Sequence, residues 1–463
     1  MTSPSDPRIP PASADIAVPQ TDIPGGLREV TLLAYPVILT QISITTMQLV
    51  DSAMVGVLGA TALAAVGLGG VWLWTMTCGL IGTTTAVQTF VSQYHGRGHD
   101  AECGTWTWQG LYAVVPATLL FSFALYFGAD AFMRWLGPSP ELQPLAAEYM
   151  SMRALGAAGI GAAVALSSFF RGLGDTRTPL YATLIANVTN AILDYGLIYG
   201  EFGLPEWGVG GAGVATAISE WVYLIALIPP FYAKSIRERY ATHFVLPSKA
   251  AIRRLLVTGI PIGGQWALEM TSFAAFLTLV ARLGDSAMAA SQAFIVLLSI
   301  SFMQAIGLST AVSTLVGKYI GSGDLDAAER SLRSGMRLAA LLAAGIAIIF
   351  LCFPEQLMSL FSSDPNVLSL GISLMGVGAL YQVFDAFAIV ADGALRGAGD
   401  TRWPFVVRFL LSWFLFLPLG YALGILAGGG LAWAWFGGVI YVALLAGVLV
   451  YRFRSGAWRS IEI

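Results

Sequence analysis

Charged residues are scarce in this sequence: they make up 11% of its 463 residues, whereas soluble domains carry about 25%. Hydrophobic residues supply 56% of the chain, and residues 339–353 contain no charge at all. Apolar runs of about 20 residues match the ~30 Å thickness of the hydrocarbon core of a membrane. The composition excludes an ordinary soluble domain and predicts an all-α protein that crosses a membrane many times.

Cysteine and histidine are rare as well, with three of each. Cys78, Cys103 and Cys352 are scattered and odd in number, so they give neither a disulfide framework nor a metal-binding spacing. The histidines fall in polar loops, and no catalytic Ser/His constellation occurs. The chain also lacks the GxxxxGK[ST] loop that holds ATP phosphates. We therefore expect no enzyme activity, no metal, no cofactor and no dependence on ATP.

Charge clusters and Gly/Pro breaks divide the apolar sequence into about twelve spans. They are predicted near 29–55, 61–92, 105–128, 144–170, 178–200, 210–232, 252–282, 287–317, 335–353, 367–394, 404–426 and 431–451. The first 26 residues are rich in Pro and Ser and lack the apolar core of a signal peptide. We predict that they form a disordered tail.

Basic residues alternate from loop to loop. Of the 24 Lys and Arg residues, 21 belong to the two ends of the chain or to every second loop, with Arg408 counted among the latter. Only Arg134, Arg153 and Arg282 fall elsewhere. Because loops rich in Lys and Arg stay in the cytoplasm, we expect a multi-pass protein of the cell membrane with both termini cytoplasmic.

The chain repeats itself at an offset of 225 residues. RGLGDTRTP at 171–179 returns as RGAGDTRWP at 396–404, with seven of nine residues identical. AVQTFVSQYHGRG at 86–98 likewise matches AVSTLVGKYIGSG at 311–323. A constant offset over six spans indicates two parallel six-helix halves, as in several transporter classes. We predict an N-lobe (27–233), a basic cytoplasmic linker (234–251), a C-lobe (252–451) and a cytoplasmic C-terminal tail (452–463) around a central cleft.

The repeated nonapeptide joins spans four and five, and again spans ten and eleven. Its glycines permit a tight turn, and its proline suits the first turn of the next helix. GLGD and GAGD also fit the GxGD pattern of intramembrane aspartyl proteases. Those enzymes need facing aspartates within the membrane, whereas Asp175 and Asp400 are expected in loops beside arginines. We favour a structural connector.

These features together resemble one transporter family. The first span reads PVILTQISITTMQLVDSAMVGVLG, the fifth contains NVTNAILDYGLI, and the paired RGxGDTRxP loops accompany them. The chain after its tail is similar to the MATE family of multidrug and toxic-compound extruders, and these two spans look most like its DinF-like branch. The resemblance implies a cation-coupled antiporter that expels amphipathic, usually cationic compounds by alternating access of two lobes.

Acidic residues inside a membrane are costly, at about 2.5–3.5 kcal/mol each at the bilayer centre. Asp51 and Asp194 each precede an outer loop by seven residues, so we expect them at similar depth. Asn190 lies four residues before Asp194, on the same helix face. Two acids that face each other in a low-dielectric site favour sharing a proton. The resemblance also implies that Asp51, Asn190 and Asp194 form the proton site.

The second half carries its own acids. PIGGQWALEM and YQVFDAFAIVADGALRG resemble the seventh and tenth spans of NorM-like relatives, which implies a Na⁺ site at Glu269 and Asp385. We favour H⁺ and keep Na⁺ as the alternative. Asp392 lies near the cytoplasmic end of its span, where it could serve merely as the ion partner of Arg396, and Glu220 is likewise a weaker candidate for function.

Pro36 lies within the first span and permits a kink there. The family's first span is thought to bend, so we hypothesise that protonation at Asp51 is coupled to bending at Pro36. Since Pro261 falls on Pro36 at the repeat offset, a purely architectural role stays open.

The substrate surface is less defined. Trp72, Trp74, Trp106, Trp108, Met47 and Met76 could line a cleft for flat cations, although tryptophans near span ends belong more often to the membrane interface.

The interpretation we favour is a multidrug antiporter for small amphipathic cations. It would work as a monomer in contact with membrane lipids and would bind no nucleic acid. The alternative is a flippase for lipids or lipid-linked oligosaccharides. A flippase cavity would favour several arginines for pyrophosphate, and the predicted spans contain almost none.

Overall fold

The computed structural model describes residues 23–461 and 463, and every regular element in this part of the chain is a helix. The helices of the first half are α1 (Leu27–Gly56), α2 (Ala60–Thr84), α3 (Ala86–Gly96), α4 (Asp100–Leu136), α5 (Leu142–Ala154), α6 (Ala157–Leu173), α7 (Arg177–Tyr199) and α8 (Gly208–Tyr232). The short α9 (Lys234–Tyr240) follows. The second half contains α10 (Lys249–Ala281), α11 (Asp285–Ser322), α12 (Leu325–Cys352), the short α13 (Pro354–Ser359), α14 (Pro365–Gly397), α15 (Arg402–Leu411), η1 (Ser412–Phe416), α16 (Leu417–Tyr421), η2 (Ala422–Leu426), α17 (Gly430–Arg454) and η3 (Ala457–Ser460).

These helices account for the twelve predicted spans. In the described residues, nine helical stretches are long and apolar enough to cross a membrane, among them the continuous stretch of α15, η1, α16 and η2. Helices α5 and α6 form a tenth span, bent by 44° at the break between them. Helices α7 and α10, of 23 and 33 residues, are also long enough to cross. The chain is thus an all-α integral membrane protein.

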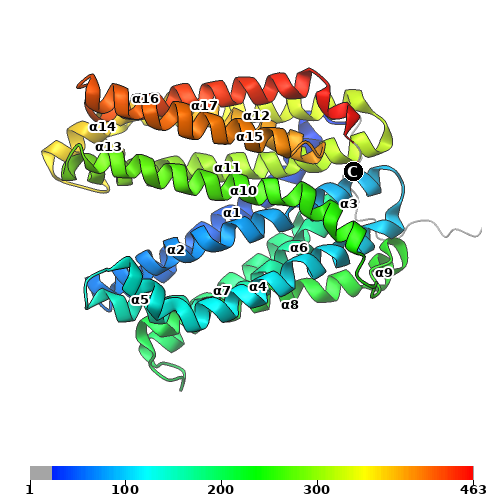
Figure 1. The fold of residues 1–463 in the computed structure, drawn as a ribbon, viewed down its shortest axis with the longest axis horizontal. Helices are drawn as coiled ribbons and strands as arrows, with labels where there is room; N and C mark the ends of the chain where they lie inside the picture. The colour runs from blue at the N-terminus through cyan, green and yellow to red at the C-terminus, as the bar shows by residue number, and fades with distance from the viewer. Residues whose placement is uncertain (1–22, 462) are drawn as a thin grey trace, which may run out of the picture.

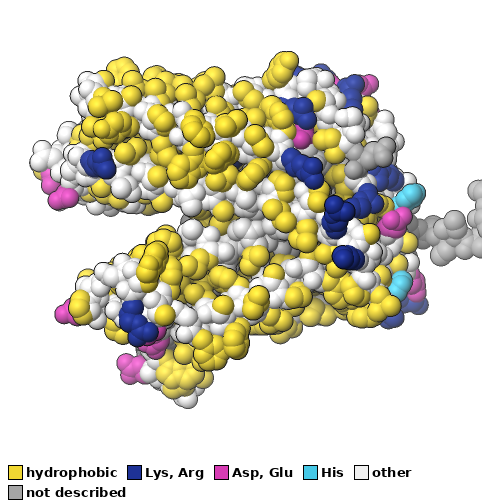
Figure 2. Space-filling model, in the orientation of Figure 1, with side chains coloured by type: hydrophobic (Ala, Val, Ile, Leu, Met, Phe, Trp, Pro, Cys, Tyr) yellow, Lys and Arg dark blue, Asp and Glu magenta, His cyan; other side chains and the backbone are white. Residues whose placement is uncertain are grey.

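The helices form two lobes, which Figure 1 shows as a blue-to-green lobe and a green-to-red lobe. The core of the second lobe is one large hydrophobic cluster, whereas the first lobe holds three smaller ones. At one end of the molecule the lobes meet, and the basic loops and the C-terminus lie there; we call this the basic end. At the opposite, open end the lobes diverge, and a wedge-shaped opening separates them (Figure 2).

The first helix of each lobe packs partly on the other lobe. Val30 and Leu33 of α1 belong to the hydrophobic core of the second lobe. Leu255 and Ile262 of α10 belong in turn to a core of the first lobe. Since Val30 and Leu255 are 225 positions apart, the exchange follows the sequence repeat and joins the lobes at the basic end.

The segment just before α1 is anchored to the second lobe. The Ser334 hydroxyl donates to the main-chain oxygen of Gly25 at 2.8 Å, and the Arg330 guanidinium donates to that of Pro24 at 2.8 Å. The predicted disordered tail, residues 1–26, therefore extends too far toward α1, because residues 24 and 25 are hydrogen-bonded to α12. The rest of that prediction, for residues 1–22, lies outside the described part of the chain.

Candidate functional site

The structure brings Asp51, Asn190 and Asp194 together, as the sequence predicts. Asp51 comes from α1 and the other two from α7, one turn apart. The side chains of Asp51 and Asn190 both lie close enough to Asp194 to share a hydrogen bond with it. Asn190 and Asp194 are fully buried. Two hydrogen bonds hold α1 and α7 together beside this group. The Asn187 amide donates to the Ser43 hydroxyl at 2.6 Å, and the Tyr199 hydroxyl donates to the Met54 carbonyl at 2.6 Å.

Several polar atoms of this trio lack a well-oriented hydrogen-bond partner. Both carboxylate oxygens of Asp194, one oxygen of Asp51 and both amide atoms of Asn190 are buried without a well-oriented partner among the described residues. Buried polar atoms are normally satisfied, and an orphaned one costs about 1–3 kcal/mol. A proton carried by one of the two acids would supply the missing donor between them. The arrangement is therefore suited to binding a proton.

A second polar group lies beside the trio. Arg153 of α5 pairs with Glu220 of α8 at 3.7 Å and donates to the Tyr149 hydroxyl at 3.4 Å. The charge of Arg153 also acts on Asp51. Glu220, a weaker candidate from sequence, thus has a structural partner that links α5 to α8.

The second lobe has a different charge arrangement. Glu269 of α10 and Asp385 of α14 interact electrostatically, and Arg408 of α15 acts on both. Arg408 Nη1 lies 3.1 Å from Glu269 Oε2, with the arginine side chain 8% and the glutamate 34% exposed. This contradicts the placement of Arg408 among the loop cations. Its position inside an otherwise apolar span, four residues after Pro404, was the available signal.

Asp392 pairs with Arg396 at 3.2 Å, as its spacing predicts. Pro36 is buried within α1, which runs as one uninterrupted helix from Leu27 to Gly56. The Thr40 hydroxyl donates to the Pro36 carbonyl at 2.8 Å. Because proline offers no N–H to the preceding turn, α1 has one backbone hydrogen bond fewer at this point. The role of Pro36 in bending stays a prediction.

The two RGxGDTRxP loops have closely similar backbones. The second glycine of each motif has positive φ, +89° at Gly174 and +83° at Gly399, a conformation that favours glycine. The first glycine of each allows close helix packing, because a Cβ on Gly172 or Gly397 would press on the main-chain oxygen of Gln88 or of its repeat equivalent, Ser313. The motif is therefore a helix connector.

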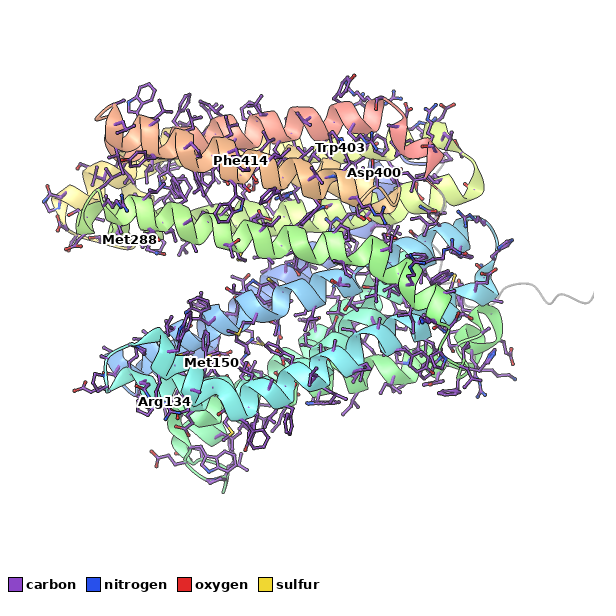
Figure 3. All side chains as sticks on the ribbon, in the orientation of Figure 1. Arg134, Met150, Met288, Asp400, Trp403 and Phe414 are labelled. Atoms are coloured by element: carbon purple, nitrogen blue, oxygen red, sulfur yellow. The ribbon has the colours of Figure 1, made fainter. Side chains whose placement is uncertain are left out.

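The aspartates of these loops serve as structural partners. Asp175 Oδ1 accepts from the main-chain N–H groups of Arg177 and Thr178, both at 3.0 Å, at the start of α7. Asp400 pairs with Arg452 of α17 at 2.7 Å, and Figure 3 shows Asp400 close to Trp403 at the start of α15. Each aspartate lies in the loop of its own lobe with partners of its own. This geometry does not support a pair of facing protease aspartates.

The same loops also join the two lobes. The Thr89 hydroxyl of α3 donates to the Arg396 carbonyl at 3.0 Å, and the Thr314 hydroxyl of α11 donates to the Arg171 carbonyl at 2.9 Å. Thr314 follows Thr89 by 225 positions, and Arg396 follows Arg171 by the same interval. We call these two hydrogen bonds the paired latch. The threonines stand in the repeated segment at 86–98 and 311–323, but the carbonyl acceptors leave no trace in the sequence.

Glu29 makes a further contact between the lobes, and this contact has no counterpart at the 225-residue offset. Glu29 of α1 is 2% exposed. It accepts from the Tyr319 hydroxyl at 2.7 Å and pairs with Lys318 at 3.5 Å, both on α11. Its repeat equivalent is Arg254, a cation that lies over the Trp106 ring. Sequence reasoning missed Glu29 because it lies at the edge of its span, where an acid appears solvated.

The aromatic candidates for the substrate surface divide into two groups. Trp106 is buried in a first-lobe core, and Trp108 donates to the Thr242 carbonyl of the linker at 3.2 Å. Neither position supports a role in a cleft. Trp72 and Met76 pack against another first-lobe core, whereas Trp74 is 45% exposed.

Comparison with known proteins agrees with this architecture. A family profile described as MatE matches residues 36–196 and 261–422, so its two matches begin 225 residues apart. The chain is 29% identical to the probable multidrug resistance protein NorM of Thermotoga maritima, over 96% of this chain and 95% of that protein. It is 31% identical to the multidrug resistance protein MdtK of Yersinia pseudotuberculosis, over 92% and 95% of the two chains. The DinF-like branch assignment stays a prediction.

Solved structures show the same fold at low sequence identity. A structure described as MATE in the straight conformation aligns with a TM-score of 0.86 at 19% identity, over 95% of this chain and 98% of that one. An outward-facing multidrug resistance MATE family transporter of the MOP superfamily aligns with a TM-score of 0.86 at 20% identity, over 94% and 97%. The duplicated helical architecture, the twofold profile match and the full-length relatives agree, and the chain belongs to the MATE family of transporters.

Proposed function

We propose that this protein is a secondary active transporter that exchanges amphipathic, cationic compounds for protons. The relatives named as multidrug resistance proteins support a broad substrate range. The observation that carries the proton assignment is the Asp51–Asp194 pair, two buried acids within hydrogen-bonding reach and without well-oriented donors. A proton completes this site, since it turns one acid into a donor for the other.

The antiport cycle follows from the charge of the site. Without a proton, the first lobe holds two carboxylates close together at the polar trio, which attract a cationic substrate. Binding of a proton reduces this negative charge and weakens that attraction. Proton and drug would therefore compete for the same charge, which is the requirement for exchange.

Alternating access would use the basic end as one of its two gates. We assign this end to the cytoplasm because it carries the basic loops. The paired latch and the Glu29 contacts keep it closed while the opposite end is open. To admit a substrate from the cytoplasm, these contacts must break and the lobes must approach each other at the open end. Bending of α1 at Pro36 would couple the state of Asp51 to this movement.

Transport in proteoliposomes tests the proposal. Vesicles containing purified protein are loaded with a fluorescent cationic dye, and a pH gradient or a sodium gradient is imposed alone. We expect dye movement with the pH gradient and its loss in Asp51→Asn. Full transport by Asp51→Asn would refute the site. If neither gradient moves dye in well-folded protein, antiport is wrong and lipid flipping becomes the activity to assay.

A further inference from the structure

The second lobe contains a buried cation, Arg408, which plays no part in the proposed proton site of the first lobe. Arg408 lies buried in the last turn of α15, and its guanidinium contacts Glu269. Arg408 Nε has no partner among the described residues. Arginine stays charged at all physiological pH values, so this cluster holds a permanent positive charge.

The groups around Arg408 would otherwise suit a small hard cation. Glu269 and Asp385 supply carboxylate oxygens, and the hydroxyls of Tyr381 and Tyr441 interact electrostatically with the same acids. Oxygen ligands of this kind bind hard cations. The guanidinium therefore occupies, at Glu269, the place that a metal ion would need.

The first lobe lacks an equivalent of this arginine. The position 225 residues before Arg408 is Thr183, whose hydroxyl donates to the Pro179 carbonyl. Arg153 of the first lobe makes its ion pair with Glu220 and acts on Asp51 through its charge, without an ion pair between them. Glu269 thus has a contacting internal cation, whereas no ion pair is found for Asp51 or Asp194 among the described residues.

We propose that Arg408 is a specificity-determining residue: a tethered cation that occupies the acids of the second lobe and excludes sodium as the coupling ion. A sodium ion at Glu269 would have to displace the guanidinium and leave it buried without its partner, which is unfavourable. A proton needs no such displacement at Asp51 and Asp194. This inference rests on the proposed antiport and explains which ion drives it.

The test compares full-length wild type, Arg408→Gln and Arg408→Lys in the dye-transport assay. Choline replaces sodium in the control vesicles. We expect wild type and Arg408→Lys to respond to the pH gradient only. Arg408→Gln should gain transport driven by sodium, about tenfold or more above its rate in choline. Sodium-driven transport by wild type, or a folded Arg408→Gln without any response to sodium, would overturn the inference.

A binding measurement separates this inference from the antiport proposal. Sodium that binds the folded protein raises its unfolding temperature, so thermal unfolding is recorded in sodium and in choline. We expect a sodium-dependent shift in Arg408→Gln that disappears in Arg408→Gln/Glu269→Gln. Wild type should show none. A shift in wild type that Glu269→Gln abolishes would refute the role of Arg408, even if no variant transports dye or Arg408→Gln does not fold.

Discussion

The Thr89 hydroxyl donates to the main-chain oxygen of Arg396 in the opposite lobe, at 3.0 Å. Thr314 makes the equivalent bond to Arg171 at 2.9 Å. The duplicated loops therefore receive hydrogen bonds across the lobe interface, in addition to connecting helices within each lobe. The glycines and aspartates of RGxGDTRxP serve the connection between helices, whereas the latch uses only the main-chain oxygen of the first arginine in each motif.

Removal of the paired latch should favour opening of the basic end. Two neutral hydrogen bonds of about 1 kcal/mol each shift a two-state equilibrium by up to about 30-fold when both are lost. We expect Thr89→Ala/Thr314→Ala to populate a state in which the opposite ends of the lobes approach each other. Spin labels at positions 134 and 282, in a background without the native cysteines, would report shorter distances. Thr89→Ser/Thr314→Ser keeps both hydroxyls and should match the parent protein.

Asp194→Asn should uncouple transport without unfolding the protein. The new carboxamide can donate to Asp51 permanently and thus replaces the proton that we place between the two acids. We expect transport driven by a pH gradient to fall by about tenfold or more, with an unfolding temperature equal to or above that of wild type. Asp130→Asn, an exposed acid of α4 that pairs with Arg134, is the matched control. Equal loss in both variants would indicate a nonspecific effect.

The Arg153–Glu220 ion pair should stabilise the folded protein, because each half-buried charge neutralises the other. Arg153→Met leaves Glu220 without its ion partner, and we expect a loss of about 1–3 kcal/mol in the free energy of unfolding. The double variant Arg153→Met/Glu220→Gln should recover at least part of it, since no lone charge remains. Thermal or denaturant unfolding of wild type, Arg153→Met, Glu220→Gln and the double variant in detergent gives the coupling free energy between the two side chains. Strictly additive losses would contradict a direct interaction.

Gly397→Ala should separate two helices that need close approach. A Cβ at this position would press on the main-chain oxygen of Ser313 in α11, so we expect destabilisation of about 1–3 kcal/mol. Gly376→Ala in the same helix α14 meets open space and should be neutral or stabilising by up to about 1 kcal/mol. Unfolding temperatures of the two variants measure the difference. Similar values for both would refute the close packing at Gly397.

Much of this architecture can be predicted from the sequence because a membrane imposes strong rules. The cost of exposing polar backbone to lipid makes each apolar run a helix, and the 225-residue offset then pairs the helices of the two halves. The cost of intramembrane charge likewise singles out Asp51 and Asp194. The sequence predicts that the two acids lie at similar depth, and the packing of α1 on α7 brings them together.

Other features depend on contacts that no local pattern contains. The acceptors of the paired latch are main-chain oxygens, which every residue carries. The packing of α1 and α10 on the opposite lobe cannot be predicted from the sequence either. Val30 and Leu255 are apolar whichever lobe they contact. Arg408 was assigned to a loop because it follows other loop cations closely. Only the approach of Glu269 from a different helix shows why its charge is tolerated within the span.

The paired latch has the pattern of an interface between identical subunits. In a two-fold dimer, each contact between residue i of one subunit and residue j of its partner occurs a second time with the roles exchanged. Thr89 with Arg396 and Thr314 with Arg171 obey this rule once 225 is subtracted from the higher numbers. The lobe interface thus has the contact pattern of an isologous homodimer, formed within a single chain. The acids and Arg408 do not obey the rule, so the pseudo-symmetric frame holds two chemically different interiors.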